Sequence, residues 1–589
     1  MADSKTTGGE FLLREVGHSR IVAPEHFSAE QKAYYETAFA FSRNEVLPKS
    51  NQIENKDFAL LRELLKKAGE IGLLGIEIPE EYGGLGLGVT TSCLVAEAKT
   101  LQGSWSVTFG GHTGIGSLPM VWYGTPKQKE KYLPKVATGE WVCAYALTES
   151  VSGSDALGAR TKAVKSADGR HWVLNGSKQF ITNAGFADLF MVFAKVDGEK
   201  FTCFIVERNT PGLVVGPEEH KMGLRGSSTC PLVFEDAKVP IDNVLGEIGK
   251  GHKIAFNVLN HGRLKLGVGV LGAMKMQLAN AVAYAKDRKQ FTTPIIQFGL
   301  TREKVARMAT AIYATESMAY RTSGLIDAKL EGADAKAGDH DAQVQRAIEE
   351  FAIESSILKV FGSEALALVT DDAVQIHGGY GYIEEYPVER AYRDARINRI
   401  FEGTNEINRM LITGMLLKRT MKGELPTFDL ASTVAEELES KSLPKAKGSD
   451  ALASETLTAE HLKRMALFSL KTAAETFGLE LEKQQVALSA ISDIMMDVYA
   501  LDSMIARTRQ VAVGGALDPA RVAMIRMFAA QAQGRSFEAA RRALTTAGKG
   551  ASLAKLQALL SYSEQSYTEL VETVAAAAEA KGGYPFALV

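Results

Sequence analysis

Two kinds of hydrophobic pattern alternate in large blocks along the chain. After Asp57, apolar residues recur at the three- and four-residue spacing of one helix face: Phe58, Leu61, Leu64, Leu65, Ala68 and Ile71. Ser28 with Gln31 has the signature of a capping box for an earlier helix, and Thr125 followed by Pro126 predicts the start of another. We therefore predict an N-terminal helical domain over residues 1–140.

The pattern changes near Trp141. Short segments rich in β-branched and aromatic residues follow, separated by Gly, Asn, Asp and Pro: 142–148, 171–175, 187–196, 201–207 and 230–239. Because turns rather than helices separate these strands, they argue against a parallel Rossmann sheet. The expectation is a small antiparallel β-domain over residues 141–245.

Helical spacing returns after the strands. Leu271, Met274, Leu278, Val282 and Ala285 form one stripe, and long Ala-rich segments cover about 300–330 and 343–370. Residues 246–422 are long enough for a four-helix-bundle domain. Residues 423–456 mix Pro, Ser, Gly and charge without apolar periodicity and are interpreted as a linker, and 457–589 as a further helical domain. The predicted fold class is mainly α with a β insertion (α+β).

Charge and cysteine content exclude several classes of protein. Lys and Arg number 67 against 70 Asp and Glu, so a formal net charge of −3 provides no basic surface for nucleic acid or an acidic membrane. The four cysteines, Cys93, Cys143, Cys203 and Cys230, form no C-x-x-C pair and no close Cys/His cluster. Neither a disulfide framework nor a metal site is predicted.

Targeting signals are not evident. Residues 1–20 contain Asp3, Glu10 and Glu15 and lack the apolar stretch of a secretory signal. No run of about 18 residues looks apolar and uncharged enough to predict a transmembrane segment. The expectation is a cytoplasmic protein.

Two segments of the β-domain contain residues suited to binding a ligand. ALTESVSGSD (146–155) offers hydroxyls and backbone N–H groups to a polar or anionic ligand, although an ordinary hairpin loop has the same composition. In SKQFITNAG (177–185), Phe180 beside Thr182 suits a planar heteroaromatic ring, although an aromatic residue on a strand is also typical of a core.

Two further segments lie in the helical region. In IHGGYGY (376–382), glycines permit the close backbone approach that a pyrophosphate needs, and a helix-ending turn explains them equally well. His377 is interpreted as a capping or hydrogen-bonding residue. In RIFEGTNEIN (399–408), Glu402 stands between apolar Phe401 and the helix cap Thr404. That position suits a general base, and it also suits a surface acid that interacts with the helix dipole.

Together these segments resemble motifs of the acyl-CoA dehydrogenase family of flavoenzymes. TES..SGSD, FITNAG, DRKQF (287–291), QIHGGYG and FEGTNEI occur in the family's order, and Glu402 lies 27 positions after Gln375. The resemblance covers about residues 30–420. It implies a helical domain, a β-domain and a four-helix domain, in agreement with the patterns above.

The resemblance also implies a reaction. Glu402 matches the base that removes the α-proton of an acyl-CoA thioester, while N5 of FAD accepts the β-hydride, which yields a trans-2-enoyl-CoA. A thioester α-proton is too weakly acidic for a free carboxylate, so the developing enolate needs donors. In the family these are the backbone N–H at the position of Glu402 and a ribityl hydroxyl of FAD.

The matching positions assign contacts to further residues. Those for FAD are Tyr145, Leu147, Thr148, Gly153, Ser154, Phe180, Thr182, Arg288, Gln375, Gly378, Gly379, Thr404 and Asn405. Of these, Gln375, Gly378 and Gly379 would reach the FAD of a neighbouring subunit. The positions that match substrate contacts are Ser154, Asn260, Arg263 and Gly403.

The sequence departs from the family pattern at three positions. Some members place the base immediately before the residue that matches Arg263, but here that residue is Gly262, which leaves Glu402 as the candidate. Ser150 replaces a common proline and Phe180 a common tryptophan. These changes affect the expected rigidity of the loop and the tuning of the flavin.

The C-terminal region resembles the extended branch of the family, which contains very-long-chain acyl-CoA dehydrogenases. This implies a homodimer that oxidises long-chain fatty acyl-CoA in β-oxidation, with electron-transfer flavoprotein as acceptor. Gly110, Gly111, Gly114 and Gly116 match a wall of the acyl cavity, although close helix packing also explains glycines there. Residues 423–456 have too few large apolar side chains to predict a membrane anchor.

Two alternative functions stay open. An acyl-CoA oxidase would use the same proton and hydride steps with oxygen as acceptor. A non-catalytic assembly protein would keep the fold without the reaction.

Overall fold

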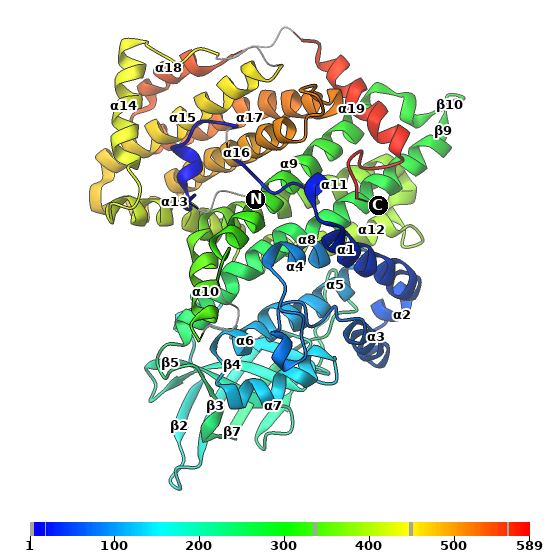
Figure 1. The fold of residues 1–589 in the computed structure, drawn as a ribbon, viewed down its shortest axis with the longest axis vertical. Helices are drawn as coiled ribbons and strands as arrows, with labels where there is room; N and C mark the ends of the chain where they lie inside the picture. Colours follow the sequence, from blue (N-terminus) through cyan, green and yellow to red (C-terminus); the bar gives the residue numbers. More distant parts are fainter. Residues whose placement is uncertain (1–4, 18, 334–337, 447–450, 562–564, 589) are drawn as a thin grey trace. The chain divides into compact units, whose positions relative to one another are not determined.

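The structure is a computed structural model that describes residues 5–17, 19–333, 338–446, 451–561 and 565–588. The predictions for residues 1–4, 18, 447–450, 562–564 and 589 lie outside the described residues. The chain divides into two compact units. Unit 1 contains Met1–Phe27, Leu266–Glu331 and Glu350–Val589, and unit 2 contains Ser28–Lys265 and Gly332–Glu349. The predicted class, mainly helical with a β insertion, is confirmed (Figure 1).

The predicted helix starts of unit 2 are present. Helix α1 (Ala29–Phe41) begins with the capping box, in which Ser28 and Gln31 exchange side-chain to backbone hydrogen bonds of 3.1 Å. Helix α3 (Phe58–Glu70) is capped by Asp57 and buries the predicted leucines. Ile71 is 46% exposed because the helix ends one residue earlier, so its assignment to the apolar face is wrong.

Unit 2 contains further helices, most of which precede the sheet in the chain. They are α2 (Ser50–Glu54), α4 (Val89–Ala98), α5 (Gly103–Gly110), the π-helix η6 (Gly111–Gly116), α6 (Leu118–Tyr123), α7 (Pro126–Ala137) and α10 (His340–Glu350). Helix α7 carries the Thr125 cap and the first-turn proline that the sequence predicts. A π-helix is wider than an α-helix and often marks a functional segment.

The strands form one eight-stranded sheet. They are β1 (Cys143–Ala146), β2 (Lys162–Lys165), β3 (His171–Thr182), β4 (Leu189–Val196), β5 (Lys200–Glu207), β6 (Leu213–Val215), β7 (Thr229–Pro240) and β8 (Val244–Leu245). The order is β6-β7-β3-β2-β4-β5-β8, with β1 paired to β4. The sheet is mixed rather than purely antiparallel, because β4 pairs in parallel with β1 and β2.

The sheet buries one continuous apolar core. Phe190, Val192, Phe204, Leu232 and Phe234 are among its members, and each is no more than 2% exposed. Strands β4 and β5 are buried on both faces, and their continuous runs of β-branched and aromatic residues between turn residues explain why they could be recognised from the sequence.

Unit 1 contains the long helices of the predicted four-helix domain. They are α8 (Gly251–Asp287, which belongs to unit 1 from Leu266 onward), α9 (Gly299–Lys329), α11 (Ala352–His377) and α13 (Asn405–Met421), with α12 (Pro387–Ala395) between the last two. Strands β9 (Lys289–Gln290) and β10 (Thr293–Pro294) form a hairpin after α8.

Helix α8 differs from one expectation. An 18-residue window in it has a mean hydropathy of 1.3 and few charges, so it is long and apolar enough to cross a membrane, although the sequence analysis predicted no such stretch. Within this window 56% is buried in the protein, and core helices of water-soluble proteins meet the same criteria.

The predicted linker contains a helix. Helix α14 (Thr427–Ser440) buries Ala431, Val434 and Leu438 and contacts α15 (Ala453–Phe477). The interpretation of 427–440 as an aperiodic linker is therefore wrong, because these three residues do follow helical spacing.

The C-terminal extension forms a layer of long helices. Helices α15, α16 (Gln485–Gln510) and α17 (Pro519–Thr546) lie side by side, followed by α18 (Leu553–Leu556) and α19 (Tyr567–Lys581) (Figure 1). The buried guanidinium of Arg507 on α16 lies 2.7 Å from Glu316 on α9. The hydroxyl of Tyr584 donates to the same carboxylate at 2.7 Å. The extension is thus joined to α9 by a buried polar network.

Candidate active site

Glu402 lies in a strained turn of unit 1, immediately before α13. Its φ is +57°, and that of Gly403 is +79°. A left-handed conformation costs a non-glycine residue about 1 kcal/mol, so the surrounding structure must hold it. Thr404 caps α13 by accepting the backbone N–H of Ile407 at 3.3 Å, as predicted. The Glu402 side chain is half-buried, and its Oε2 atom is inaccessible to solvent.

Two side chains hold the carbonyl groups of this turn. Lys359, on α11 and fully buried, donates from Nζ to the Gly403 carbonyl at 2.6 Å and to Asn405 Oδ1 at 2.7 Å. Asn408 Nδ2 lies 2.8 to 3.3 Å from the carbonyl oxygens of residues 402, 403 and 404. The turn that carries the proposed base is therefore fixed from two sides.

The glycine turn follows the end of α11. Gly378 has φ +60° and ends the helix, and a Cβ on Gly378 or Gly379 would meet no atom within 4 Å. A Cβ on Gly381 would lie 2.5 Å from the Val374 carbonyl oxygen, so this glycine is required by packing. His377 Nδ1 lies 2.7 Å from the Ala373 carbonyl oxygen, in agreement with a hydrogen-bonding role. The helix-ending explanation therefore holds for Gly378, and the approach of a pyrophosphate to Gly378 and Gly379 stays a prediction.

Arg288 lies beside this glycine turn. Its guanidinium stands 5.6 Å from the centre of the Tyr380 ring. Arg288, Gln375, Gly378 and Gly379 are all exposed. A cation, an amide and an open backbone thus gather on one surface of unit 1, which is the donor set that a pyrophosphate needs.

The predicted flavin loop of unit 2 is fixed by a buried ion pair. Lys178 Nζ lies 2.7 Å from Glu149 Oε1 and 3.2 Å from the Leu147 carbonyl oxygen. Glu149 also accepts hydrogen bonds from the backbone of Arg160 and Thr161. Burial acts to raise the pKa of Glu149, but the Lys178 ammonium and these donors hold the pKa below its usual value. This leaves Gly153 and Ser154 exposed at the loop's tip.

A bulge in β3 turns Phe180 outward. The β3–β7 register shifts between Lys178 and Ile181, and Phe180 adopts φ +59° with 61% exposure. The core interpretation of Phe180 is therefore wrong. Gln179 donates its backbone N–H to the Thr148 carbonyl at 2.8 Å, which brings this strand end next to the flavin loop. Thr182 follows at the end of the strand, and Tyr145 lies on β1.

The π-helix η6 lies against the same strand end. A Cβ on Gly111 would lie 3.1 Å from Thr182 Cγ2, and one on Gly116 would lie 2.8 Å from Cys143 Cβ. His112 Nδ1 accepts the Cys143 backbone N–H at 3.1 Å, which leaves Nε2 to donate to the Val136 carbonyl. Burial lowers the pKa of His112 to about 4, so the imidazole is neutral.

The four glycines of this region therefore differ. Close packing explains Gly111 and Gly116, whereas a Cβ on Gly114 would meet no atom within 4 Å. A Cβ on Gly110 would lie 3.0 Å from Nζ of buried Lys99, whose pKa burial lowers to about 7. Only Gly114 thus borders open space.

The predicted substrate residues Asn260 and Arg263 contact each other. Arg263 Nη1 donates to Asn260 Oδ1 at 2.6 Å, and both residues are less than 9% exposed. On the same segment of α8, Lys265 lies 2.7 Å and His261 2.8 Å from Glu77. Burial acts to raise the pKa of Glu77, but the two neighbours hold that pKa far below its usual value.

Sequence reasoning missed three supporting residues: Lys178, Lys359 and Asn408. A signal for Lys359 existed, because it interrupts the mostly apolar helical run 351–362. Lys178 lies within the quoted strand motif but has no distinctive spacing. No sequence pattern marked Asn408.

In each unit, the residues present fit part of a flavin nucleotide. Unit 2 offers an outward aromatic side chain beside a hydroxyl and an exposed polar loop tip. Unit 1 offers the exposed arginine and open glycine backbone. Within the part of the chain that the structure describes, no three His, Cys, Asp or Glu side chains come together as metal ligands.

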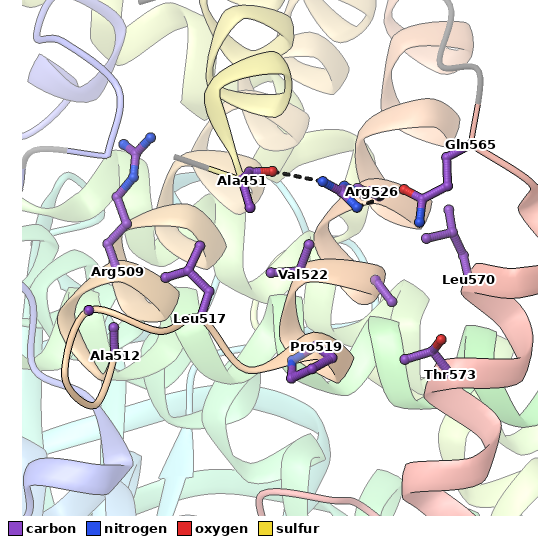
Figure 2. Close-up of a pocket in the computed structure, with 12 residues that line it drawn as sticks. Ala451, Arg509, Ala512, Leu517, Pro519, Val522, Arg526, Gln565, Leu570 and Thr573 are labelled. Atoms are coloured by element: carbon purple, nitrogen blue, oxygen red, sulfur yellow. Dashed lines mark hydrogen bonds between the residues drawn. The ribbon is translucent and has the colours of Figure 1, made fainter. Parts of the chain in front are cut away.

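A cavity of about 580 Å³ lies in the C-terminal extension (Figure 2). Arg526 at its wall donates to the Ala451 carbonyl at 2.8 Å and to Gln565 at 2.7 Å. A second cavity of about 830 Å³ is lined in part by Arg14, Glu460 and Arg464. None of the predicted site residues lines either cavity, so neither belongs to the candidate active site.

Family models match most of the chain. They describe the acyl-CoA dehydrogenase N-terminal domain (residues 28–140), the middle domain (144–237) and two C-terminal domains (249–417 and 461–561). The last match covers much of the extension.

Individual relatives agree with these matches. A probable acyl-CoA dehydrogenase of Bacillus subtilis (strain 168) is 50% identical over 86% of each chain. The very long-chain specific acyl-CoA dehydrogenase of Homo sapiens is 44% identical over 58% of this chain and 51% of that protein. A crystal structure of an acyl-CoA dehydrogenase complexed with FAD from Bacillus anthracis has a TM-score of 0.95 and 44% identity, and covers 98% of this chain and 100% of that one. With the motifs and the fold described above, these matches show that the chain belongs to the acyl-CoA dehydrogenase family of oxidoreductases, in the branch with an additional C-terminal domain.

Proposed function

We propose that this protein uses FAD to oxidise long-chain fatty acyl-CoA thioesters to trans-2-enoyl-CoA, with Glu402 as the base. The observation that carries the proposal is the fixed turn of residues 402–404, which holds a half-buried carboxylate at a helix start in a conformation that an ordinary surface acid does not need.

The reaction requires a weak base to remove a weakly acidic proton. In the proposal, Glu402 takes the α-proton, and its backbone N–H donates to the thioester oxygen, where negative charge develops. Bound FAD supplies the acceptor for the β-hydride. Gly403, Asn260, Arg263 and Ser154 are proposed to contact the substrate.

The FAD contacts are proposed for two groups of residues. In unit 2 they are Tyr145, Leu147, Thr148, Gly153, Ser154, Phe180 and Thr182. In unit 1 they are Arg288, Gln375, Gly378, Gly379, Thr404 and Asn405. Exposure of Phe180 and of the set around Arg288 supports these assignments, because a ligand then has access to them.

An anaerobic titration tests the proposal. Acyl-CoAs of increasing chain length are added to the purified yellow protein, and flavin bleaching is recorded. We expect bleaching by palmitoyl-CoA in the wild type and a loss of at least a thousandfold in its rate in Glu402→Gln, since an amide cannot accept the proton. Glu406→Gln, four residues later in the first turn of α13, is the matched control and should bleach normally. No bleaching of the FAD-loaded wild type would contradict the proposal.

Electron acceptor, assembly and location are parts of the same proposal. We expect electron-transfer flavoprotein to reoxidise the reduced protein faster than oxygen does, and peroxide as the main product would indicate an oxidase instead. We expect a homodimer of the 63.6 kDa chain in sedimentation experiments, because the exposed residues Gln375, Gly378 and Gly379 are assigned to a neighbouring subunit's FAD. Cell fractionation should place it in the cytoplasm.

A further inference from the structure

We propose that Lys359 is a positioning residue for the base, and that its ammonium holds the 402–404 turn in the conformation in which Glu402 can remove the α-proton. This inference rests on the proposed role of Glu402. The geometry behind it lies wholly within unit 1, on helices α11 and α13.

Lys359 places a positive charge in the interior of unit 1. Its side chain is fully buried, so removing the ammonium from water has a high free-energy cost unless hydrogen-bond acceptors replace the water. Among its acceptors are the backbone carbonyl oxygen of Gly403 and the amide oxygen of Asn405.

The charge of Lys359 is directed at the turn that carries Glu402. The ammonium contacts the residue that directly follows the base and the first residue of α13. A hydrogen bond from a charged donor is about twice as strong as a neutral one. It therefore acts against relaxation of the left-handed backbone at Glu402 and Gly403. The positive charge also favours the ionised form of a nearby carboxylate. Glu406 is an example: hydrogen bonds from its own backbone and from Thr404 lower its pKa most, and the charges of Arg409 and Lys359 lower it further.

Lys359 is itself held in place through Asn405, to which it donates. Asn405 Nδ2 donates to Ser363 at 3.1 Å and to Glu364 at 3.0 Å, both on α11. Glu364 pairs with Arg409 of α13, and Arg409 also contacts Asp493 of α16 at 2.7 Å. A continuous polar network therefore connects the turn to the C-terminal extension and limits the movement of the lysine.

The test compares substitutions of two buried lysines. Lys359→Met removes the ammonium at similar length, and Lys359→Gln keeps a neutral donor that can satisfy the same acceptors and so protect the fold. Lys463→Met is the matched control, because Lys463 is 3% exposed and donates to the backbone carbonyl of Arg14 and to Glu460, not to the 402–404 turn.

Proton removal is measured apart from hydride transfer. A long-chain 3,3-dimethylacyl-CoA has α-protons but no β-hydrogen, so exchange of its α-protons into D₂O reports on the base alone. Each FAD-loaded variant is also assayed for palmitoyl-CoA binding, flavin content, thermal midpoint and the pH profile of flavin reduction.

We expect exchange and reduction to fall at least tenfold in Lys359→Met and at least threefold in Lys359→Gln, with palmitoyl-CoA affinity within threefold of wild type. The acid limb of the pH profile should move to higher pH, because the turn that carries the carboxylate loses the cation bound to its Gly403 carbonyl. Lys463→Met should lose thermal stability but keep both rates.

The outcomes separate the two proposals. If the wild type neither exchanges nor bleaches, the proposed function fails. If the wild type does both and folded Lys359→Gln matches its rates and its acid limb, the lysine is only structural and this inference alone is overturned. A fall in rate that Lys463→Met reproduces would overturn it as well, since it would then reflect general loosening.

Discussion

Nζ of Lys178 and Oε1 of Glu149 lie 2.7 Å apart, with side-chain exposures of 0% and 4%. This pair joins the end of β3 to the loop that follows β1. Both segments carry proposed FAD contacts, which are Phe180 and Thr182 on the strand and Thr148 on the loop. The ion pair therefore connects the fold of the sheet to the geometry of the cofactor site.

Lys178→Met should destabilise unit 2 and weaken FAD binding. It leaves a buried carboxylate without its cation, for which the typical cost is about 3 kcal/mol or more. The prediction is a lower midpoint in urea and faster loss of flavin during gel filtration. Lys178→Met combined with Glu149→Gln should recover part of the loss, because the uncompensated charge is then gone. Equal flavin retention in wild type and single variant would contradict the prediction.

The buried carboxyl group of Glu354 should make the stability of the protein depend on pH. Burial raises the pKa of this carboxyl to about 7, despite a 2.7 Å hydrogen bond from the Gly9 backbone N–H. The native state therefore keeps a proton that the unfolded state releases above its ordinary pKa of 4.5. The stability that this group contributes is complete below pH 4.5 and is lost as the pH rises to 7, by up to about 3 kcal/mol.

Glu354→Gln removes this titration but keeps an oxygen that can accept the Gly9 N–H. The free energy of unfolding of the variant should rise relative to that of the wild type between pH 5 and pH 7. The difference between the two should level off above pH 7. Urea midpoints at pH 5, 6, 7 and 8 measure it. A difference that does not change with pH would exclude Glu354 as its source.

Patterns with a local cause could be predicted from the sequence. The capping residues Ser28 and Thr125 satisfy orphan N–H groups within their own helix turn, so four residues of sequence are sufficient to identify them. Strand β4 was likewise recognisable from its continuous apolar run, and the residues of both its faces, such as Phe190 and Met191, are buried. The fold class and the family motifs followed from such patterns.

Features that depend on distant residues could not be predicted. The parallel pairing of β1 with β4 joins segments more than forty residues apart, and turn composition does not encode it. Phe180 faces outward because of a bulge against β7, whereas its sequence environment is that of a core strand. Lys359 acquires its partners only when α11 packs on α13. Each of these results from tertiary packing, which overrides local preference.

Tyr584 should contribute to the attachment of the extension. Its buried hydroxyl donates to Glu316, which also contacts Arg507. Tyr584→Phe removes this donor from a buried carboxylate and should cost about 1 to 3 kcal/mol. Thermal unfolding measures the loss, and flavin reduction in the folded variant should match the wild type. An unchanged midpoint would mean that water or another donor replaces the hydroxyl.

Gly114 should set the preferred length of the acyl chain. It is the one glycine of the four in this wall, all of which the structure describes, whose added Cβ would meet no atom within 4 Å. If this space receives the end of a long acyl chain, Gly114→Leu should fill it. Leucine is also a better helix former than glycine, so the fold should tolerate the change.

Filling the space should act on long substrates and spare short ones. We expect kcat/KM for palmitoyl-CoA to fall about tenfold or more relative to that for octanoyl-CoA, since one or a few misplaced methylene groups account for a discrimination of this size. Gly111→Ala is the matched control. Its Cβ would press on Thr182 and Asn183 beside the flavin strand, so it should reduce activity at every chain length alike. A chain-length profile of Gly114→Leu that is parallel to the wild type would show that the acyl chain lies elsewhere.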